Sequence, residues 1–200
     1  MLIGFFIEPE KKLKKIILDY KKIIKKNYGN QIYLAHPPHL TLFTIKLKKK
    51  LLKNKIIQIS KFIKNYKRIK INITKVNFFY NDPQTKGNTM FLSIKKNISL
   101  CNFQIETIEF LNEIIGNRNI VKKKKFSGLM KKNHKKYGYP FVGKNWIPHF
   151  TISSISKKND LKKIKLNLKK KIKLTNRVKN ISIWLINKNQ HKKLHTINLR

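Results

Sequence analysis

The sequence is poor in cysteine and in acidic residues, and both shortages exclude classes of protein. Cys101 is the only cysteine among 200 residues, so the chain can form no intrachain disulfide and no cysteine-based metal cluster. The 8 acidic residues include no D-x-D pair and no H-x-x-E-H pattern. Because carboxylates are scarce, there is little material for a Mg²⁺ or Zn²⁺ site. We therefore expect no metal and no cofactor.

Long hydrophobic runs are also missing. No apolar stretch approaches the roughly 20 residues that are needed to cross a membrane. The run Leu2 to Ile7 is too short for the core of a signal peptide, and no basic flank precedes it. We expect a soluble, cytoplasmic protein that has no membrane partner and is a monomer.

Arginine and alanine are scarce, although the chain is strongly basic. Lysine outnumbers arginine 44 to 4, Ala35 is the only alanine, and isoleucine and asparagine supply 31 and 22 residues. This composition is typical of an AT-rich genome. The formal charge of +40 would ordinarily indicate a polyanionic partner such as nucleic acid. Since phosphate recognition more often uses the bidentate fork of arginine, codon bias explains much of the lysine, but the charge still attracts anionic substrates.

Apolar patterns predict an α+β protein. A hydrophobic content of 40% is enough for a packed core. Apolar residues at helical spacing predict helices around residues 13–24, 50–65, 98–115 and 158–171. Alternating or short buried runs predict strands at residues 2–7, 39–47, 69–80, 89–94, 149–154, 178–187 and 193–199. Residues 122–145 follow neither period, and we interpret them as a long loop.

A pattern that occurs twice is the strongest feature of the sequence. Residues 38–42 read PHLTL and residues 148–152 read PHFTI, in a chain with only 6 histidines and 6 prolines. On a strand, each histidine shares a face with its threonine, while the apolar neighbours take the other face. H-x-T alone is a weak pattern, and a lone histidine on a strand is usually a tolerated polar residue. The repetition of five positions instead indicates functional residues, which are His39, Thr41, His149 and Thr151.

The two halves of the chain also repeat an order of elements: strand, helix, motif strand, helix and a pair of strands. The first strand of the second half is weak and is assigned to residues 119–121. We expect a single domain, residues 1–200, made of two pseudo-symmetric lobes at residues 1–97 and 98–200. A duplicated fold packed about a pseudo-twofold axis would place the two motif strands next to each other.

Two histidines on neighbouring strands suit a displacement at phosphorus. Histidine has an unperturbed pKa of about 6.5, so one ring of a pair can accept a proton while the other donates one. In-line displacement places the attacking and leaving oxygens on opposite sides, which matches a base on one side and an acid on the other. Threonine hydroxyls can donate hydrogen bonds to the non-bridging phosphoryl oxygens. The pattern therefore predicts phosphoester chemistry that needs no metal ion.

The two motifs, one in each half, resemble the signature of the 2H phosphoesterase superfamily, and the resemblance spans essentially the whole chain. It implies a bilobal, duplicated α+β fold in which two antiparallel sheets with outer helices surround a central cleft. It also implies metal-independent hydrolysis of 2′,3′-cyclic phosphates or 2′-5′ phosphodiester bonds in RNA or oligonucleotides, as in RNA 2′,3′-cyclic phosphodiesterases and 2′-5′ RNA ligase-like enzymes. By the matching positions, His39 and His149 would be the acid and base pair, and Thr41 and Thr151 the phosphate ligands. We take His149 as the base and His39 as the acid, but the roles can be reversed.

The lysine-rich segment before the second motif carries the candidate substrate contacts. The distance between the motifs is longer than in compact members of the superfamily, and the excess falls mainly here. Aromatic rings can stack on a nucleobase, worth about 1–3 kcal/mol each, and lysines can meet phosphates. The alternative is that the rings pack in the core and the lysines are solvated. The candidates are Tyr137, Tyr139, Phe141, Lys144 and Trp146.

The other histidines lie outside the two motifs. His36 precedes the first motif and could line the mouth of a cleft, although a solvated loop position is the simpler interpretation. His134, His191 and His195 have no partner motif, and we assign them no role.

Two other functions stay open. A non-catalytic, basic RNA-binding protein could hold phosphate with the same residues, but its binding would fall steeply with salt and leave the phosphodiester intact. Within the enzyme class, the substrate could be a cyclic or 2′-5′ signalling oligonucleotide, and RNA end processing and reversible 2′-5′ joining are not distinguished.

Overall fold

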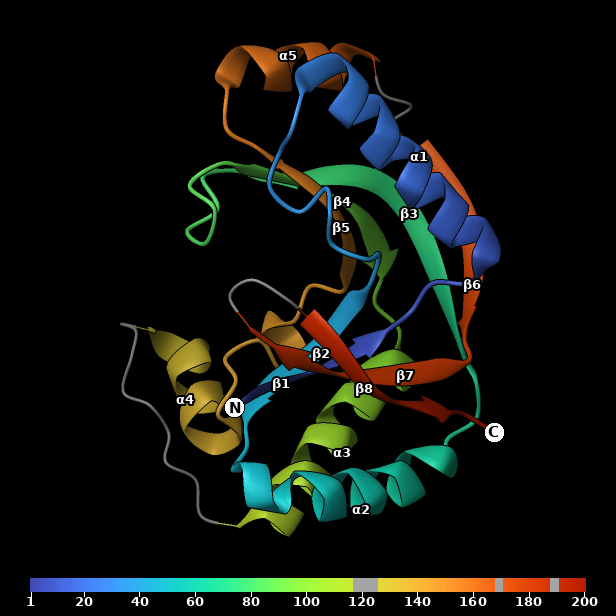
Figure 1. Ribbon diagram of the computed structural model, residues 1–200, viewed down its shortest axis with the longest axis vertical. Coiled ribbons are helices and arrows are strands. Elements are labelled where there is room, and N and C mark those ends of the chain that lie inside the picture. Colours follow the sequence, from blue (N-terminus) through green and yellow to red (C-terminus); the bar gives the residue numbers. More distant parts are fainter. Residues whose placement is uncertain (117–125, 168–170, 188–190) are drawn as a thin grey trace.

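The computed structural model describes residues 1–116, 126–167, 171–187 and 191–200 (Figure 1). Its strands are β1 (Leu2–Ile7), β2 (Leu40–Lys46), β3 (Ile69–Phe79), β4 (Asn88–Lys95), β5 (His149–Ile155), β6 (Lys171–Val178), β7 (Asn180–Ile186) and β8 (His191–Asn198). Its α-helices are α1 (Lys11–Tyr28), α2 (Leu52–Lys64), α3 (Ile98–Ile115), α4 (Gly128–Tyr137) and α5 (Lys158–Asn167), and two 3₁₀ turns are η1 (Lys49–Leu51) and η2 (Gly143–Asn145).

The strands form one curled antiparallel sheet in the order β6-β3-β4-β5-β2-β1-β7-β8 (Figure 1). The two motif strands, β2 and β5, meet at its centre through a single residue pair, Leu40 with Phe150. The sheet therefore has two four-stranded halves, which the sequence predicted as two separate sheets. The predicted α+β class is confirmed, and so is the prediction that the two motif strands are neighbours.

Each half of the sheet takes strands from both ends of the chain. β1 and β2 lie beside β7 and β8, while β3 and β4 lie beside β5 and β6. The strands of the two lobes are thus interleaved along the sequence, and a division of the chain near residue 97 does not follow the strand pairing.

The helices cover the outside of the curled sheet. α1 and α5 lie over the half that contains β5, while α2 and α3 lie over the other half (Figure 1). Leu13, Ile17 and Ile24 recur at helical spacing along α1 and are buried, while most of its lysines face solvent. This is the stripe that the periodicity predicted. No helix in the described ranges is long and apolar enough to cross a membrane.

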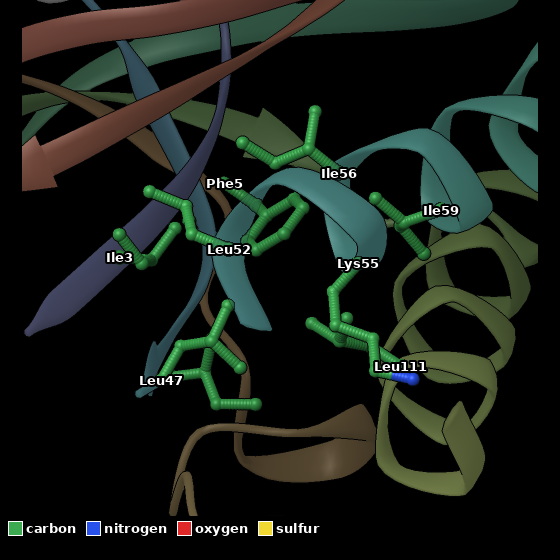
Figure 2. A pocket seen from close by; sticks show the side chains of 9 residues that line it. Ile3, Phe5, Leu47, Leu52, Lys55, Ile56, Ile59 and Leu111 are labelled. Atoms are coloured by element: carbon green, nitrogen blue, oxygen red, sulfur yellow. The ribbon is translucent and has the colours of Figure 1, made fainter. Parts of the chain in front are cut away.

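A small gap remains in the core between β1, β2, α2 and α3 (Figure 2). It measures about 10 Å³, near the lower limit for one water molecule, and a buried water needs two or more polar partners. The gap is therefore a packing imperfection rather than a binding site. It is lined by Ile3, Phe5, Ile45, Leu47, Leu52, Lys55, Ile56, Ile59 and Leu111.

The interpretation of residues 122–145 as a loop is wrong over α4. This helix has little apolar periodicity. Hydrogen bonds from one of its side chains to the backbone that follows it stabilise it instead. The buried side chain of Asn133 donates through Nδ2 to the carbonyls of Pro140 and Val142, at 3.2 and 2.9 Å. Bonds from a side chain to distant backbone leave no trace in an apolar pattern, which is why the pattern did not predict the helix.

The helix predicted at residues 158–171 is too long, because α5 ends at Asn167 and β6 starts at Lys171. Ile172, Leu174 and Val178 alternate along β6, which pairs with β3. In the sequence, Lys173 continues the lysine-rich pattern of the preceding helix, so this pattern hides the two-residue period. The strand predicted at residues 119–121 lies outside the described residues.

Candidate active site

The two motifs lie where β2 and β5 meet. Leu40 and Phe150 pair across the strands, and both side chains are fully buried on the helix-covered face. The register of this pair sets each histidine opposite the threonine of the other motif. Since alternate residues and cross-strand neighbours share a face, the histidines and threonines lie together on the inner face of the sheet. We call this surface the histidine face; its residues are His39, Thr41, His149 and Thr151, all half-buried.

Each imidazole of the histidine face is held by its own backbone in the same way. Nδ1 of His39 lies 2.7 Å from the carbonyl oxygen of Pro37, and Nδ1 of His149 lies 2.7 Å from that of Ile147. A carbonyl only accepts, so Nδ1 carries the hydrogen of each neutral ring and Nε2 is left to accept a proton. The proline before each histidine is buried, and its fixed φ restrains this local turn. That restraint explains why the proline belongs to both motifs.

A phenylalanine from the neighbouring strand supports each histidine. Phe6 on β1 pairs with the first motif's threonine, and its ring centroid lies 4.4 Å from that of His39. Phe91 on β4 pairs with the second motif's threonine, and its ring lies 4.9 Å from that of His149. The strand register shifts immediately before each phenylalanine, and such a bulge re-aims side chains. The internal symmetry of the fold therefore includes residues that the motifs do not contain.

Two further rings extend this aromatic support. Phe79 on β3 lies 4.1 Å from Phe91 and 5.0 Å from His149, between ring centroids. Trp184 on β7 lies edge-on to Phe6 at 6.4 Å. β3 and β7 occupy matching places, one strand beyond β4 and β1. Sequence reasoning missed all of these rings, since only the register of the sheet brings them to the histidines.

Positive charge surrounds His39. Burial is the main cause that lowers the pKa of His39 to about 4, and the charges of His36, Lys21 and His191 add to the effect. The backbone hydrogen bond to its Nδ1 opposes these causes but does not cancel them. His39 is therefore neutral at neutral pH and able to accept a proton.

The surroundings of His149 differ from those of His39 because the carboxylate of Asp82 acts on His149. Burial again lowers the pKa of His149, but the backbone hydrogen bond and the charge of Asp82 both raise it. Asp82 is held in place because it accepts hydrogen bonds from the backbone N–H of Gln84, at 2.9 Å, and from the hydroxyl of Thr89, at 2.6 Å. The symmetry of the histidine face is thus broken electrostatically, and His149 retains a proton more readily than it would without Asp82.

The segment before the second motif holds the first motif strand. β2 leaves β5 after the central pair, and side chains satisfy its carbonyl oxygens there. The buried amide of Gln104 on α3 donates to the carbonyls of Leu42 and Phe141, at 2.8 and 2.9 Å. The indole N–H of Trp146 donates to the carbonyl of Thr41, at 3.0 Å.

The segment before the first motif holds the second motif strand in return. The backbone N–H of Ser154 on β5 donates to the carbonyl of Ile32 at 2.9 Å. The hydroxyl of Ser154 also lies 2.7 Å from that of Thr85, in the connection between β3 and β4. Each motif strand is therefore fixed by the chain that leads into the other motif.

The aromatic candidates of the lysine-rich segment have partners other than the two motif histidines. Tyr137 is buried and donates its hydroxyl to a glutamate of α3 at 3.1 Å, and burial raises the pKa of Tyr139. Phe141 packs edge-on to Tyr139 at 5.7 Å, and Lys144 is exposed. Trp146 is buried against β2 with its N–H already bonded. Because Tyr137 bonds to α3 and Trp146 to β2, their position gives no support to the predicted base contact.

The site offers no obvious metal ligands. Within the ranges that the structure describes, no three His, Cys, Asp or Glu side chains are grouped to hold a metal ion. Cys101 is half-buried in α3 with a free thiol.

Comparison with known proteins places these features in context. Residues 9–190 match the model of the 2′-5′ RNA ligase superfamily. No match is found among curated proteins. The protein TT0787 of Thermus thermophilus shares the fold with a TM-score of 0.68 and 11% identity, over 100% of this chain and 98% of that one. The crystal structure of E. coli LigT complexed with 3′-AMP also shares the fold, with a TM-score of 0.60 and 10% identity, over 98% of this chain and 96% of the LigT chain.

Proposed function

Since the chain belongs to the 2′-5′ RNA ligase superfamily, we propose that it is a metal-independent phosphodiesterase acting on 2′,3′-cyclic phosphates or 2′-5′ phosphodiester bonds of RNA or oligonucleotides. One observation carries the proposal. The two imidazoles share the inner face of the sheet, each is anchored through Nδ1, and each leaves Nε2 available. A site for binding alone would need no such paired tautomers, since lysine holds phosphate better at neutral pH.

We assign His39 as the general base and His149 as the general acid, which reverses the order taken from the sequence. His39 lies among cations and is neutral at neutral pH, so its Nε2 takes a proton from water. His149 has the help of Asp82 in keeping a proton, which it gives to the departing ribose oxygen. The water oxygen bonds to phosphorus as the bond from phosphorus to that ribose oxygen breaks, so one proton is taken and one is returned.

The other groups of the site have supporting roles. The hydroxyls of Thr41 and Thr151 donate to the non-bridging oxygens, where negative charge must be held in the transition state. Phe79 packs against His149, and Trp184 packs against the Phe6 ring that supports His39; both rings offer surface for a nucleobase, where stacking is worth about 1–3 kcal/mol per base. A nucleotide substrate therefore suits this surface better than a small phosphodiester without a base.

The direct test is hydrolysis in the absence of metal. Adenosine 2′,3′-cyclic phosphate incubated with the protein in excess EDTA is expected to give a monophosphate, followed by phosphorus NMR. Formation of the 2′- or the 3′-monophosphate shows which ribose oxygen leaves. A reaction that needs an added divalent ion, or no product from either the cyclic phosphate or a 2′-5′ dinucleotide, would contradict the proposal.

The dependence of the rate on pH follows from the two histidines. The base must be neutral, so kcat/KM falls as the pH drops below the pKa of His39. The acid must be protonated, so kcat/KM also falls as the pH rises above the pKa of His149. Both pKa values lie below the ordinary 6.5. We therefore expect a bell-shaped profile of kcat/KM with its maximum below pH 6.5. A maximum above pH 7 would contradict the assignment.

Asp82 provides an internal check on the same profile. The variant Asp82→Asn keeps a side-chain acceptor for the Gln84 backbone but removes the negative charge that raises the pKa of His149. Its basic limb should move to lower pH while the acidic limb, which belongs to His39, stays in place.

A further inference from the structure

Two histidines outside the motifs face each other near His39. His36 lies in the segment before β2, and His191 is the first residue of β8. Their ring centroids are 4.9 Å apart with an interplanar angle of 81°. Tyr33 packs edge-on against His36 at 5.2 Å. We call His36 and His191 the outer histidine pair.

The outer histidine pair lies close enough to Lys21 and to His39 for their charged forms to repel one another. Burial, followed by the charges of His191 and Lys21, lowers the pKa of His36. The charges of both His36 and His191 also lower the pKa of His39. In the described part of the chain, the charged groups that shift the pKa of His36 are His191 and Lys21, which are both basic. The carboxylate of Asp82 instead raises the pKa values of Tyr33 and His149. An anion placed among these rings would relieve their mutual repulsion.

Hydrogen-bonding capacity at the pair is unused. Nδ1 of His191 is buried and, among the residues that the structure describes, has no hydrogen-bond partner. A buried polar atom left unpaired is unfavourable unless a ligand or water satisfies it. Lys21 is already committed, because its Nζ donates to the carbonyls of Tyr33 and His36 at 2.6 Å each. It fixes the segment that carries His36, and the imidazoles are the groups left for a ligand.

We propose that the outer histidine pair binds a second phosphate of the substrate, the one on the 5′ oxygen of the nucleotide whose 2′ or 3′ phosphate meets the histidine face. This inference rests on the proposed function. The 5′ phosphate of a nucleotide is a monoester and the last internucleotide phosphate of an RNA 3′ end is a diester, but both are attached to the same 5′ oxygen and both present non-bridging oxygens, so the site accepts either. Imidazole N–H groups donate hydrogen bonds to phosphate oxygens, and a bound anion favours the protonated form of the ring, which makes these bonds charge-assisted. The enzyme should therefore prefer 5′-phosphorylated substrates over nucleoside cyclic phosphates.

A comparison of two substrates tests this preference. For the wild type, adenosine 2′,3′-cyclic phosphate with a 5′-phosphate should have a KM about tenfold below that of the same compound without it. The double variant His36→Gln, His191→Gln should lose this difference between the two KM values. The variant His195→Gln, at an exposed position of the same strand β8, should keep it. Equal KM values in the wild type, or a preference that survives in the double variant, would overturn the proposal.

A binding measurement separates this inference from the proposed function, because it needs no turnover. In isothermal titration, the wild type should bind adenosine 3′,5′-bisphosphate about tenfold more tightly than 3′-AMP, and the double variant should bind both equally. If this preference is found but no substrate is hydrolysed, the second-phosphate site stands and the proposed function fails. If hydrolysis is found without any preference for the bisphosphate, the second-phosphate site fails and the proposed function stands.

Discussion

Replacing His39 or His149 with alanine is expected to lower kcat for a 2′,3′-cyclic phosphate by about 10²–10⁴-fold. Each substitution removes one of the two proton transfers of the proposed mechanism. Because the two histidines act in one step, the double variant should lose little more than the worse single variant.

The two single variants should also differ in a way that identifies the roles. If His39 is the base, His39→Ala loses the acidic limb of the kcat/KM profile and keeps the basic one. If His149 is the acid, His149→Ala loses the basic limb. If His39→Ala instead lost the basic limb and His149→Ala lost the acidic limb, the roles of acid and base would be reversed and the two-histidine mechanism would stand.

The control for these variants is His195→Ala, since His195 is exposed on β8. Its kcat and its pH profile should match those of the wild type. Each imidazole also packs against a phenylalanine, so the thermal unfolding of all variants must be compared. Full activity in the double variant, with the fold intact, would exclude a role for either imidazole in the reaction.

The centre of the site could be predicted because its information is local. Proline, histidine and threonine occupy fixed places in each motif, and the alternation of a strand decides which of them share a face. The repetition of the motif then predicted that two strands would be neighbours, and the pair of Leu40 with Phe150 confirms it.

The aromatic support of the histidines could not be predicted, because its information lies in strand register. Phe6 and Phe91 meet the histidines only after a bulge shifts each of them by one place. In the sequence, both are ordinary apolar residues of a buried strand. The same limit misplaced Trp146, whose ring was expected at the substrate but whose N–H is used by the carbonyl of Thr41.

Hydrogen bonds from the chain before each motif to the strand of the other motif explain how β2 and β5 stay fixed where they meet. β2 and β5 share one residue pair, which alone is too little to hold two strands in register. The missing ladder bonds are replaced by Gln104 and Trp146 on the side of β2, and by the bond between Ser154 and Ile32 on the side of β5. A change in either preceding segment should therefore disturb the histidine that lies in the other motif.

Gln104→Met is the sharpest test of this coupling. The side chain is fully buried on α3, and methionine fills a similar volume without its hydrogen bonds. The carbonyls of Leu42 and Phe141 and the backbone N–H of Gly143 would lose their partner. Each unsatisfied buried group costs about 1–3 kcal/mol, so the free energy of unfolding, measured in urea, should fall by about 3 kcal/mol or more. Gln58→Met, at an exposed position of α2, should change it by less than about 0.5 kcal/mol.

The same variant should also lose activity while it is folded, although Gln104 lies on the helix-covered side of β2. Leu42 follows Thr41 directly, so movement of β2 displaces the hydroxyl of Thr41 and the imidazole of His39 together. A misplacement of about 1 Å can cost up to about 10²-fold in rate, and we expect kcat to fall by about 10-fold or more with KM little changed. A variant that is destabilised but has the kcat of the wild type would show that Gln104 supports the core alone. A matched loss of kcat and stability would show that Gln104, which joins β2 to the segment before the second motif, sets the geometry of the first motif.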